Sequence, residues 1–223
     1  MEPSLGMPCP LCGAAAPFGC WAWGRAIHRC PVCGLHFVPP AYWMTIAEEI
    51  ARYKLHHNCI DDTGYVRFLM PVIECLRRHG VRGRVLDYGA GPTPVLTQLL
   101  IREGFKAQGY DPYFAGQDNN ELITPVENGV VDAVVSTEVF EHFREPAREM
   151  DRIGLLVGTG GLLVVLTALV TEDVRMDTWH YANDATHIIF YTGETFRYIA
   201  RRWGFQMVEC DGNRLVVLRR VET

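Results

Sequence analysis

Val85-Leu86-Asp87-Tyr88-Gly89-Ala90-Gly91-Pro92-Thr93 is the most informative stretch of this 223-residue sequence. It is typical of a buried strand that ends in an acidic residue and turns through G-x-G into a helix. The glycines let the backbone turn sharply and approach a ligand closely. Asp111 ends the next predicted strand, twenty residues after Gly91, where a carboxylate can accept hydrogen bonds from both hydroxyls of a ribose. Together they predict a site for a ribose-bearing ligand.

Two common nucleotide motifs do not fit this turn. A dinucleotide fingerprint needs a third glycine in G-x-G-x-x-G, and that position is Pro94, which argues against NAD or FAD. A Walker loop is excluded because no Gly-Lys-Ser/Thr follows. The remaining ligand class bears a ribose and needs no phosphate cradle.

Strands and helices alternate from residue 84 onward. This alternation predicts an α/β fold with a Rossmann-like, mostly parallel sheet, helices on both faces and a C-terminal antiparallel hairpin. A small N-terminal zinc-ribbon module completes the expected fold class. The predicted strands are 84–88, 106–110, 130–136 and 162–170, the helices are 94–103, 145–156 and 194–203, and the hairpin strands are 206–210 and 214–218.

The N-terminal cysteines form two similar units. Cys9-Pro10-Leu11-Cys12-Gly13 recurs as Cys30-Pro31-Val32-Cys33-Gly34, with seventeen residues between the pairs. This spacing predicts a four-cysteine zinc site, closed and therefore structural. Metal binding would replace the hydrophobic core that so short a module lacks. A redox pair, unligated thiols or a rubredoxin-like iron are the alternatives.

Three units follow from these patterns. Residues 1–40 form the zinc ribbon, 41–80 a helical bridge or lid, and 81–223 the main domain. In the bridge, Thr45 and Glu48 have the capping-box form and predict a helix to about residue 57. A second helix is expected over 62–79, with Pro71 in its interior as a site for a kink. The segment 52–58 is placed either to cover the ligand or, as a solvated helix end, to pack the ribbon onto the main domain.

Composition and charge limit the classes of partner that the chain is expected to bind. The net charge is −5, and no run of Lys and Arg exceeds two, so the electrostatic footprint of a nucleic-acid-binding protein is missing. Residues 153–170 carry no charge, but four small or turn-forming residues at 158–161 would split a membrane-spanning helix there. With no visible export signal, we expect no membrane association and a cytoplasmic location where thiols stay reduced.

At this point the sequence resembles the class I S-adenosylmethionine-dependent methyltransferases, over roughly residues 84–220. Residues 87–91 are similar to their first motif, D/E-x-G-x-G, and Asp111 matches the acidic residue that holds the ribose. The string from Ser136 to Phe143 resembles the strand-4 exit of the small-molecule branch that includes the quinone-biosynthesis methyltransferases. Residues 179–190 resemble the loop after strand 5 in the same group.

The resemblance implies a set of site residues. In this chain the family's usual third strand is shortened, so the adenine contact is open between Val126, Glu127 and Asn128 and the aromatic Tyr113. The expected catalytic or substrate-contacting bases are His142, His180 and His187, with loop-ordering hydrogen bonds as the alternative for each. The implied cofactor-binding residues are Asp87, Gly89, Ala90, Gly91, Asp111, Pro112, Tyr113, Thr137 and Glu138.

The leading functional hypothesis is transfer of a methyl group from S-adenosylmethionine to a small-molecule acceptor. An rRNA or protein acceptor, recognised through the zinc ribbon, is the second hypothesis, and the acidic balance weighs against RNA. A non-catalytic zinc-ribbon scaffold on a methyltransferase fold is the third.

Overall fold

A computed structural model describes residues 6–55, 58–114 and 131–222. Its large sheet has six strands in the order β11-β12-β9-β8-β6-β7. Strands β6 (Arg84–Tyr88), β7 (Lys106–Tyr110), β8 (Val131–Thr137) and β9 (Val157–Leu166) are parallel, whereas β12 (Leu215–Arg220) and β11 (Phe205–Cys210) add an antiparallel hairpin. The expected fold class is therefore confirmed.

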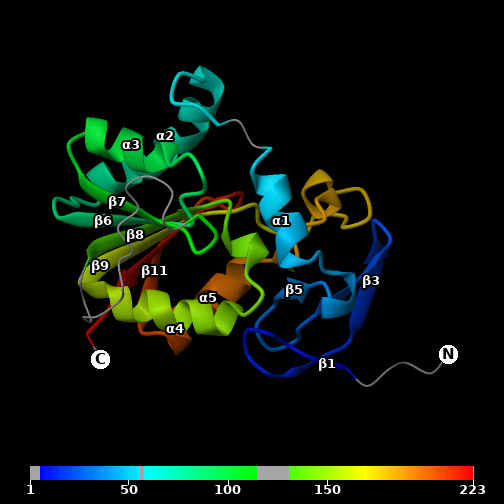
Figure 1. Cartoon of the computed structure of the whole chain (residues 1–223). Helices are drawn as coiled ribbons and strands as arrows, with labels where there is room; N and C mark the ends of the chain where they lie inside the picture. The colour runs from blue at the N-terminus through cyan, green and yellow to red at the C-terminus, as the bar shows by residue number, and fades with distance from the viewer. Residues whose placement is uncertain (1–5, 56–57, 115–130, 223) are drawn as a thin grey trace.

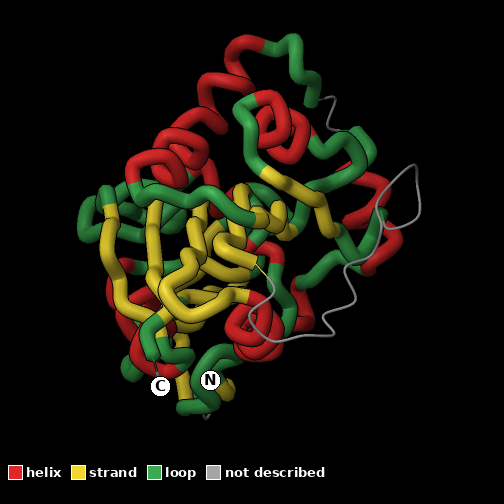
Figure 2. The backbone as a smooth tube through the Cα atoms, turned by 90° about the vertical axis from the view of Figure 1, so that its left-hand side faces the viewer, coloured by secondary structure: helices red, strands yellow, loops and turns green. Residues whose placement is uncertain are grey.

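Helices cover both faces of this sheet, because its central strands are apolar on both sides. On β9, Leu162 and Val164 face one core and Leu163 and Val165 face the other. Figure 1 shows α2 (Thr63–Arg78) and α3 (Val95–Arg102) on one side and α4 (Pro146–Leu156) and α5 (Gly193–Arg202) on the other. Seen from the side in Figure 2, the strands lie between helical layers.

The cysteine-rich module lies beside the large sheet, next to α1 (Figure 1). Strands β1 (Met7–Pro8) and β2 (Ala15–Ala16) pair with each other, while β3 (Phe18–Ala22), β4 (Arg25–Arg29) and β5 (His36–Phe37) form an antiparallel sheet. That sheet gains a fourth strand, β10 (Ile189–Phe190), which pairs with β5. The module thus shares a sheet with the segment that follows β9.

Two helices connect the module to the large sheet. Helix α1 (Ile46–Tyr53) starts at the predicted capping box, in which Thr45 and Glu48 bond reciprocally, but it ends before residue 57. Helix α2 starts after Asp62, whose carboxylate accepts from the backbone N–H groups of Gly64 and Tyr65, and it continues through Pro71. A short 3₁₀ turn, Pro40–Tyr42, precedes them.

Strand β9 differs from its prediction. The expected strand at 162–170 after a glycine turn is wrong at both ends, because β9 begins at Val157 and ends at Leu166. The glycines lie in a bulge, where pairing with β8 shifts from Val157 opposite Val131 to Leu162 opposite Ala133. Within the described residues, no helix has the length and apolar character needed to cross a membrane.

Candidate active site

The four N-terminal cysteines converge on one point. The Sγ atoms of Cys9 and Cys33 lie 3.5 Å apart, those of Cys12 and Cys30 lie 3.4 Å apart, and all four lie within 4.8 Å of one another. None is in a disulfide. Two thiolates bound at about 2.3 Å to one tetrahedral ion lie about 3.8 Å apart, so the cluster has the size of a zinc site.

Each cysteine pair lies in the same kind of turn. In the first, the N–H of Gly13 donates to the carbonyl of Cys9 at 2.8 Å, and in the second the N–H of Gly34 donates to that of Cys30 at 3.0 Å. Both glycines have a left-handed backbone, with φ of +79° and +74°, which explains why glycine follows each pair. The sequence repeat is therefore a repeat of structure.

The turn after β6 is held from both sides. The N–H groups of Gly89 and Ala90 both donate to the carbonyl of Tyr110, at 2.7 and 3.0 Å. Gly89 has φ of +88°, and a Cβ atom there would lie 2.4 Å from Cγ2 of Val139. Only glycine fits between the turn and the strand-4 exit, so this glycine is required by close approach as well as by conformation.

Asp87 lies behind the turn rather than in the cavity. Its side chain is buried and accepts a hydrogen bond from Thr97 Oγ1 in α3 at 2.8 Å. Burial raises the pKa of Asp87 to about 7. Asp87 therefore links the turn to the following helix. It does not line the cavity, so any effect of Asp87 on a bound cofactor would come from holding the turn in position.

Asp111 faces the glycine turn across the end of β7. Its Oδ2 accepts from the N–H of Gly91 at 2.9 Å and its Oδ1 accepts from the N–H of Tyr113 at 2.8 Å. Burial raises the pKa of Asp111, against the lowering effect of these backbone donors. Each carboxylate oxygen has a second lone pair, so the carboxylate can also accept from two vicinal hydroxyls.

The segment at the end of β8, which corresponds to the family's strand-4 exit, has an unusual backbone conformation and a hydroxyl without a hydrogen-bond partner in the part of the chain that the structure describes. Glu138 has φ of +52°, a strained conformation for a residue other than glycine. Its carboxylate pairs with Arg214 at 3.2 Å, yet burial and the neighbouring Glu141 raise its pKa to about 8. The hydroxyl of Thr137 is buried and has no hydrogen-bond partner among the described residues.

Two of the predicted histidines meet beyond this exit. The rings of His142 and His187 are 4.9 Å apart. Nδ1 of His142 lies 2.9 Å from the carbonyl of Thr186, and Nδ1 of His187 lies 2.7 Å from the carbonyl of Tyr181. Burial lowers the pKa of His142 and lowers that of His187 to about 3, so both rings are neutral at pH 7.

Arg25, on β4 of the cysteine-rich module, holds the loop that carries His187. Its guanidinium is buried and donates to four backbone carbonyls of that loop: Ala182, Asp184 at 3.0 Å, Ala185 at 3.3 Å and His187 at 3.1 Å. Five donors in a rigid fork suit such a cluster of carbonyls. The module thereby fixes the shape of the loop after β9.

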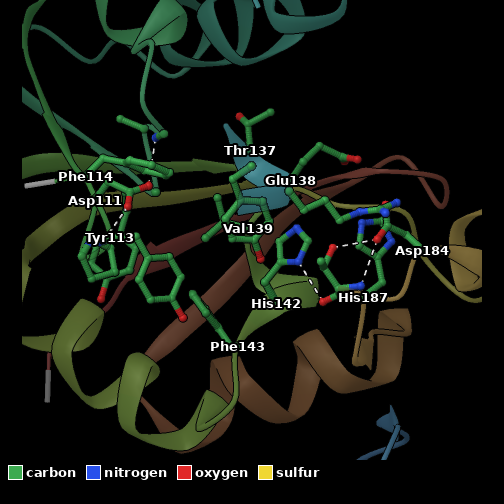
Figure 3. Close-up of a pocket in the computed structure, with 18 of the residues that line it drawn as sticks. Asp111, Tyr113, Phe114, Thr137, Glu138, Val139, His142, Phe143, Asp184 and His187 are labelled. Atoms are coloured by element: carbon green, nitrogen blue, oxygen red, sulfur yellow. Dashed lines mark hydrogen bonds and ion pairs between the residues drawn. The ribbon is translucent and has the colours of Figure 1, made fainter. Parts of the chain in front are cut away.

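The glycine turn, Asp111, the exit of β8 and the two histidines line one cavity of about 800 Å³ at the carboxyl ends of the parallel strands. Figure 3 shows Asp111 and Tyr113 at one end, His142 and His187 at the other, and Thr137, Glu138 and Val139 between them. Pockets of 300–1,000 Å³ are typical of small-molecule sites. The cavity is large enough for a nucleoside cofactor together with a small second ligand.

The cavity gathers most of the predicted site residues, although their roles stay predictions. Asp87 does not line it, and His180 lines it but is exposed and lies outside the histidine pair. Val126, Glu127 and Asn128 lie outside the described residues. The predicted residues in the lining are Gly89, Ala90, Gly91, Asp111, Pro112, Tyr113, Thr137, Glu138, His142, His180 and His187.

Sequence reasoning did not single out three residues near the histidine end of the cavity, although Tyr53 falls in the segment 52–58 that it placed over the ligand. Glu141 is fully buried beside His142, although it belongs to the string that indicated His142. The hydroxyl of Tyr53 is buried and has no partner in the described part of the chain, and the centroid of its ring lies 5.3 Å from that of His142. Arg25 gave no signal, because a lone arginine in a short strand reads as a surface residue.

Fold and site together define an α/β domain of the nucleotide-binding type, with its cavity at the carboxyl edge of a parallel sheet. The sequence matches the family described as "Methyltransferase domain" over residues 64–210. The chain therefore belongs to this family of class I S-adenosylmethionine-dependent methyltransferases, and the resemblance found in the sequence is confirmed. No curated protein matches the sequence significantly.

Solved structures show the same fold at low sequence identity. A protein from Galdieria sulphuraria, described as a sarcosine dimethylglycine methyltransferase, has a TM-score of 0.54 and 14% identity over 70% of this chain and 86% of its own. A methyltransferase solved with the Trm112 methyltransferase activator of Haloferax volcanii has a TM-score of 0.52 and 16% identity, covering 68% and 89%. Magnesium protoporphyrin IX methyltransferase from Synechocystis has a TM-score of 0.50 and 15% identity, covering 81% and 97%.

Proposed function

We propose that this chain transfers the methyl group of S-adenosylmethionine to a small-molecule acceptor bound beside His142 and His187. One observation supports this most directly: a single cavity joins the glycine turn and Asp111 at one end to two neutral histidines at the other. Structures of similar fold include methyltransferases described as acting on sarcosine dimethylglycine and on magnesium protoporphyrin IX. Acidic side chains accompany the arginines in its lining, so the described residues form no strongly basic groove of the kind that RNA requires.

The residues at the first end fit the family's cofactor. Asp111 would accept from the ribose hydroxyls, and the absence of a Cβ at Gly89 leaves its turn close to Val139 and the strand-4 exit. The unpaired hydroxyl of Thr137 is a further polar group that a ligand could satisfy. When bound, the cofactor supplies a sulfonium-activated methyl group, so the protein needs to align and desolvate more than to activate.

The histidines would orient the acceptor and receive its proton. Because each Nδ1 faces a backbone carbonyl, it must carry the hydrogen, and each Nε2 presents a lone pair. A neutral Nε2 can accept a hydrogen bond from an acceptor O–H or N–H and take the proton as the methyl group is transferred. Tyr53, from α1, would close the cavity over this end.

We also propose that Cys9, Cys12, Cys30 and Cys33 hold one structural Zn²⁺. In this arrangement residues 1–40 act as a zinc ribbon, 41–80 as a bridge whose first helix covers the acceptor, and 81–223 as the catalytic domain. Through Arg25 the ribbon would order the acceptor loop instead of recruiting a macromolecule. Metal analysis should find zinc in wild type and one equivalent less in Cys30→Ser; wild-type protein without zinc would contradict this assignment.

Calorimetry with S-adenosylhomocysteine tests the cofactor site. Asp111→Ala should weaken binding at least tenfold, since it removes a charge-assisted acceptor for two hydroxyls. Asp173→Ala is the matched control, because Asp173 is exposed on the loop after β9 and does not line the cavity. Equal binding by the Asp111 variant and wild type would refute the ribose assignment, and absence of binding by wild type would refute the proposed function.

A further inference from the structure

Three residues that can ligate a metal lie close together at the acceptor end of the cavity. Glu141 Oε1, a ring nitrogen of His142 and one of His187 lie within 4.8 Å of one another. Oε1 lies 3.9 Å from His142 Nε2, and it has no hydrogen-bond partner among the described residues although Glu141 is fully buried. A buried carboxylate oxygen without a partner is costly and calls for an explanation.

The hydrogen bonds of the two rings rule out a donor between them in their neutral form. Both Nδ1 atoms donate to backbone carbonyls, so both Nε2 atoms are acceptors. Glu141 Oε2 is already occupied, because Thr167 Oγ1 donates to it at 2.9 Å. The cluster therefore brings together two imidazole nitrogens and one carboxylate oxygen. All three are electron-pair donors, so a cation between them would bind to each.

We propose that Glu141, His142 and His187 bind a divalent first-row transition-metal ion in the acceptor half of the cavity. Two imidazoles and a carboxylate are a donor set that suits such ions and leaves positions open. The carbonyls of Thr186 and Tyr181 and the hydroxyl of Thr167 would act as outer partners that fix ligand orientation. An ion bound at about 2.1 Å would draw the three ligand atoms closer together than they are without it.

The charges around the cluster are compatible with a cation. Asp184 carries a negative charge near both rings, and its partner Arg52 offsets it at 3.0 Å. Arg214 faces the carboxylates of Glu138 and Glu141 and pairs with the first. Arg25 approaches the same loop but is occupied by its four carbonyls. Each of these arginines thus already has an acceptor nearby. No arginine pairs with Glu141 Oε1 among the described residues, so this oxygen can still bind a cation.

A second group of ligand-type residues provides a contrast. Cys75, His79 and Glu209 also lie within 4.8 Å of one another. There, however, Arg78 donates to both carboxylate oxygens of Glu209, at 2.7 and 2.8 Å, and Arg219 lies 3.2 Å from His79 Nδ1. Two guanidinium groups already satisfy those lone pairs, so a cation would compete with them. Of these two groups among the described residues, the one at the acceptor end is therefore the proposed site of the ion.

The role of the ion rests on the proposed methyl transfer, whereas its binding does not. With the ion bound, the two Nε2 atoms would be metal ligands and no longer proton acceptors. An acceptor hydroxyl that ligates the ion would instead lose its proton to water, because a bound cation lowers the pKa of a ligated hydroxyl. The resulting oxyanion would form a bond to the methyl carbon while the carbon–sulfur bond breaks, giving the O-methyl product and S-adenosylhomocysteine. The acceptor class is then an oxygen compound able to ligate a metal.

The test is binding of Mn²⁺, followed by electron paramagnetic resonance, to protein that has first received one equivalent of Zn²⁺, which the four soft thiolates hold in preference to the imidazole and carboxylate donors. Mn²⁺ prefers oxygen and nitrogen to thiolate ligands, so the cysteine site does not interfere. We expect one equivalent to bind in wild type and affinity to fall at least tenfold in Glu141→Gln and in His187→Ala. His180→Ala is the matched control, because this histidine lines the same cavity outside the cluster.

The outcomes separate this proposal from the proposed function. Thermal melts and S-adenosylhomocysteine binding by each variant establish that it is folded. Failure of folded wild type to bind Mn²⁺, or equal binding by wild type and the Glu141 and His187 variants, would overturn the metal site while leaving the cofactor site intact. Loss of binding in His79→Ala instead would move the ion to the other cluster and overturn it as well. Mn²⁺ binding without cofactor binding would leave the metal site and refute the methyl transfer.

Discussion

Gly89→Ala tests the close approach between the glycine turn and the strand-4 exit. The new Cβ would lie 2.4 and 2.6 Å from the two Cγ atoms of Val139, at a backbone φ of +88°. The left-handed conformation costs an alanine about 1–2 kcal/mol, and forcing extra volume into a packed site costs about 1–3 kcal/mol more. We therefore expect the free energy of unfolding to fall by roughly 2–5 kcal/mol.

The chain offers a matched control for this variant. Gly104 has the same φ of +88°, and a Cβ there would meet no atom within 4 Å. Gly104→Ala should therefore lose only the conformational part, about 1–2 kcal/mol, and its affinity for S-adenosylhomocysteine should match wild type. Urea unfolding and calorimetry measure both quantities. Similar losses of stability in the two variants, or cofactor affinity unchanged in Gly89→Ala, would refute the argument that Val139 makes glycine necessary.

Two further predictions concern buried charged groups. Arg25→Ala should destabilise the chain by about 2–4 kcal/mol, because it leaves four loop carbonyls without their donor, and hydrogen exchange should rise in residues 182–187; unchanged exchange there would contradict the ordering role. The pKa of Asp87 is raised to about 7 in the folded chain but is about 3.9 in an unfolded chain. Between these two values the folded state binds one more proton than the unfolded state. The contribution of Asp87 to the free energy of unfolding therefore falls as the pH rises from about 4 to 7. Asp87→Asn should remove that decline in urea unfolding curves, and parallel pH profiles of variant and wild type would count against it.

Local patterns predicted the elements whose interactions lie close in the sequence. The start of α1 came from a capping box, and the extent of β7 from a short run between a glycine turn and Asp111. The end of α1 and the bounds of β9 were wrong, because helix ends depend on what they pack against and β9 is extended by pairing with β8 through a bulge. A bulge is stabilised by the partner strand, so its own residues read as a turn.

In the candidate site, too, the residues that the sequence predicted are those whose interactions are local. Residues 85–93, Asp111 and the repeated cysteine units carry their chemistry in short spacings, because each depends on one turn or on one strand and the next. From the sequence alone they indicated the methyltransferase family and predicted a four-cysteine zinc site. The string around His142 indicated a histidine, but not that Glu141 beside it would be buried with one free oxygen.

Tertiary structure alone decided what surrounds the histidine end of the cavity. His142 and His187 are forty-five positions apart in the sequence, and they meet because β8 and β9 are adjacent parallel strands whose exits open on the same edge. Arg25 reaches the loop of His187 because β5 of the cysteine-rich module pairs with β10. Sequence determines contacts made within a turn, where the chain itself fixes the distance. Contacts between distant segments depend on sheet order and burial, which only the folded chain sets.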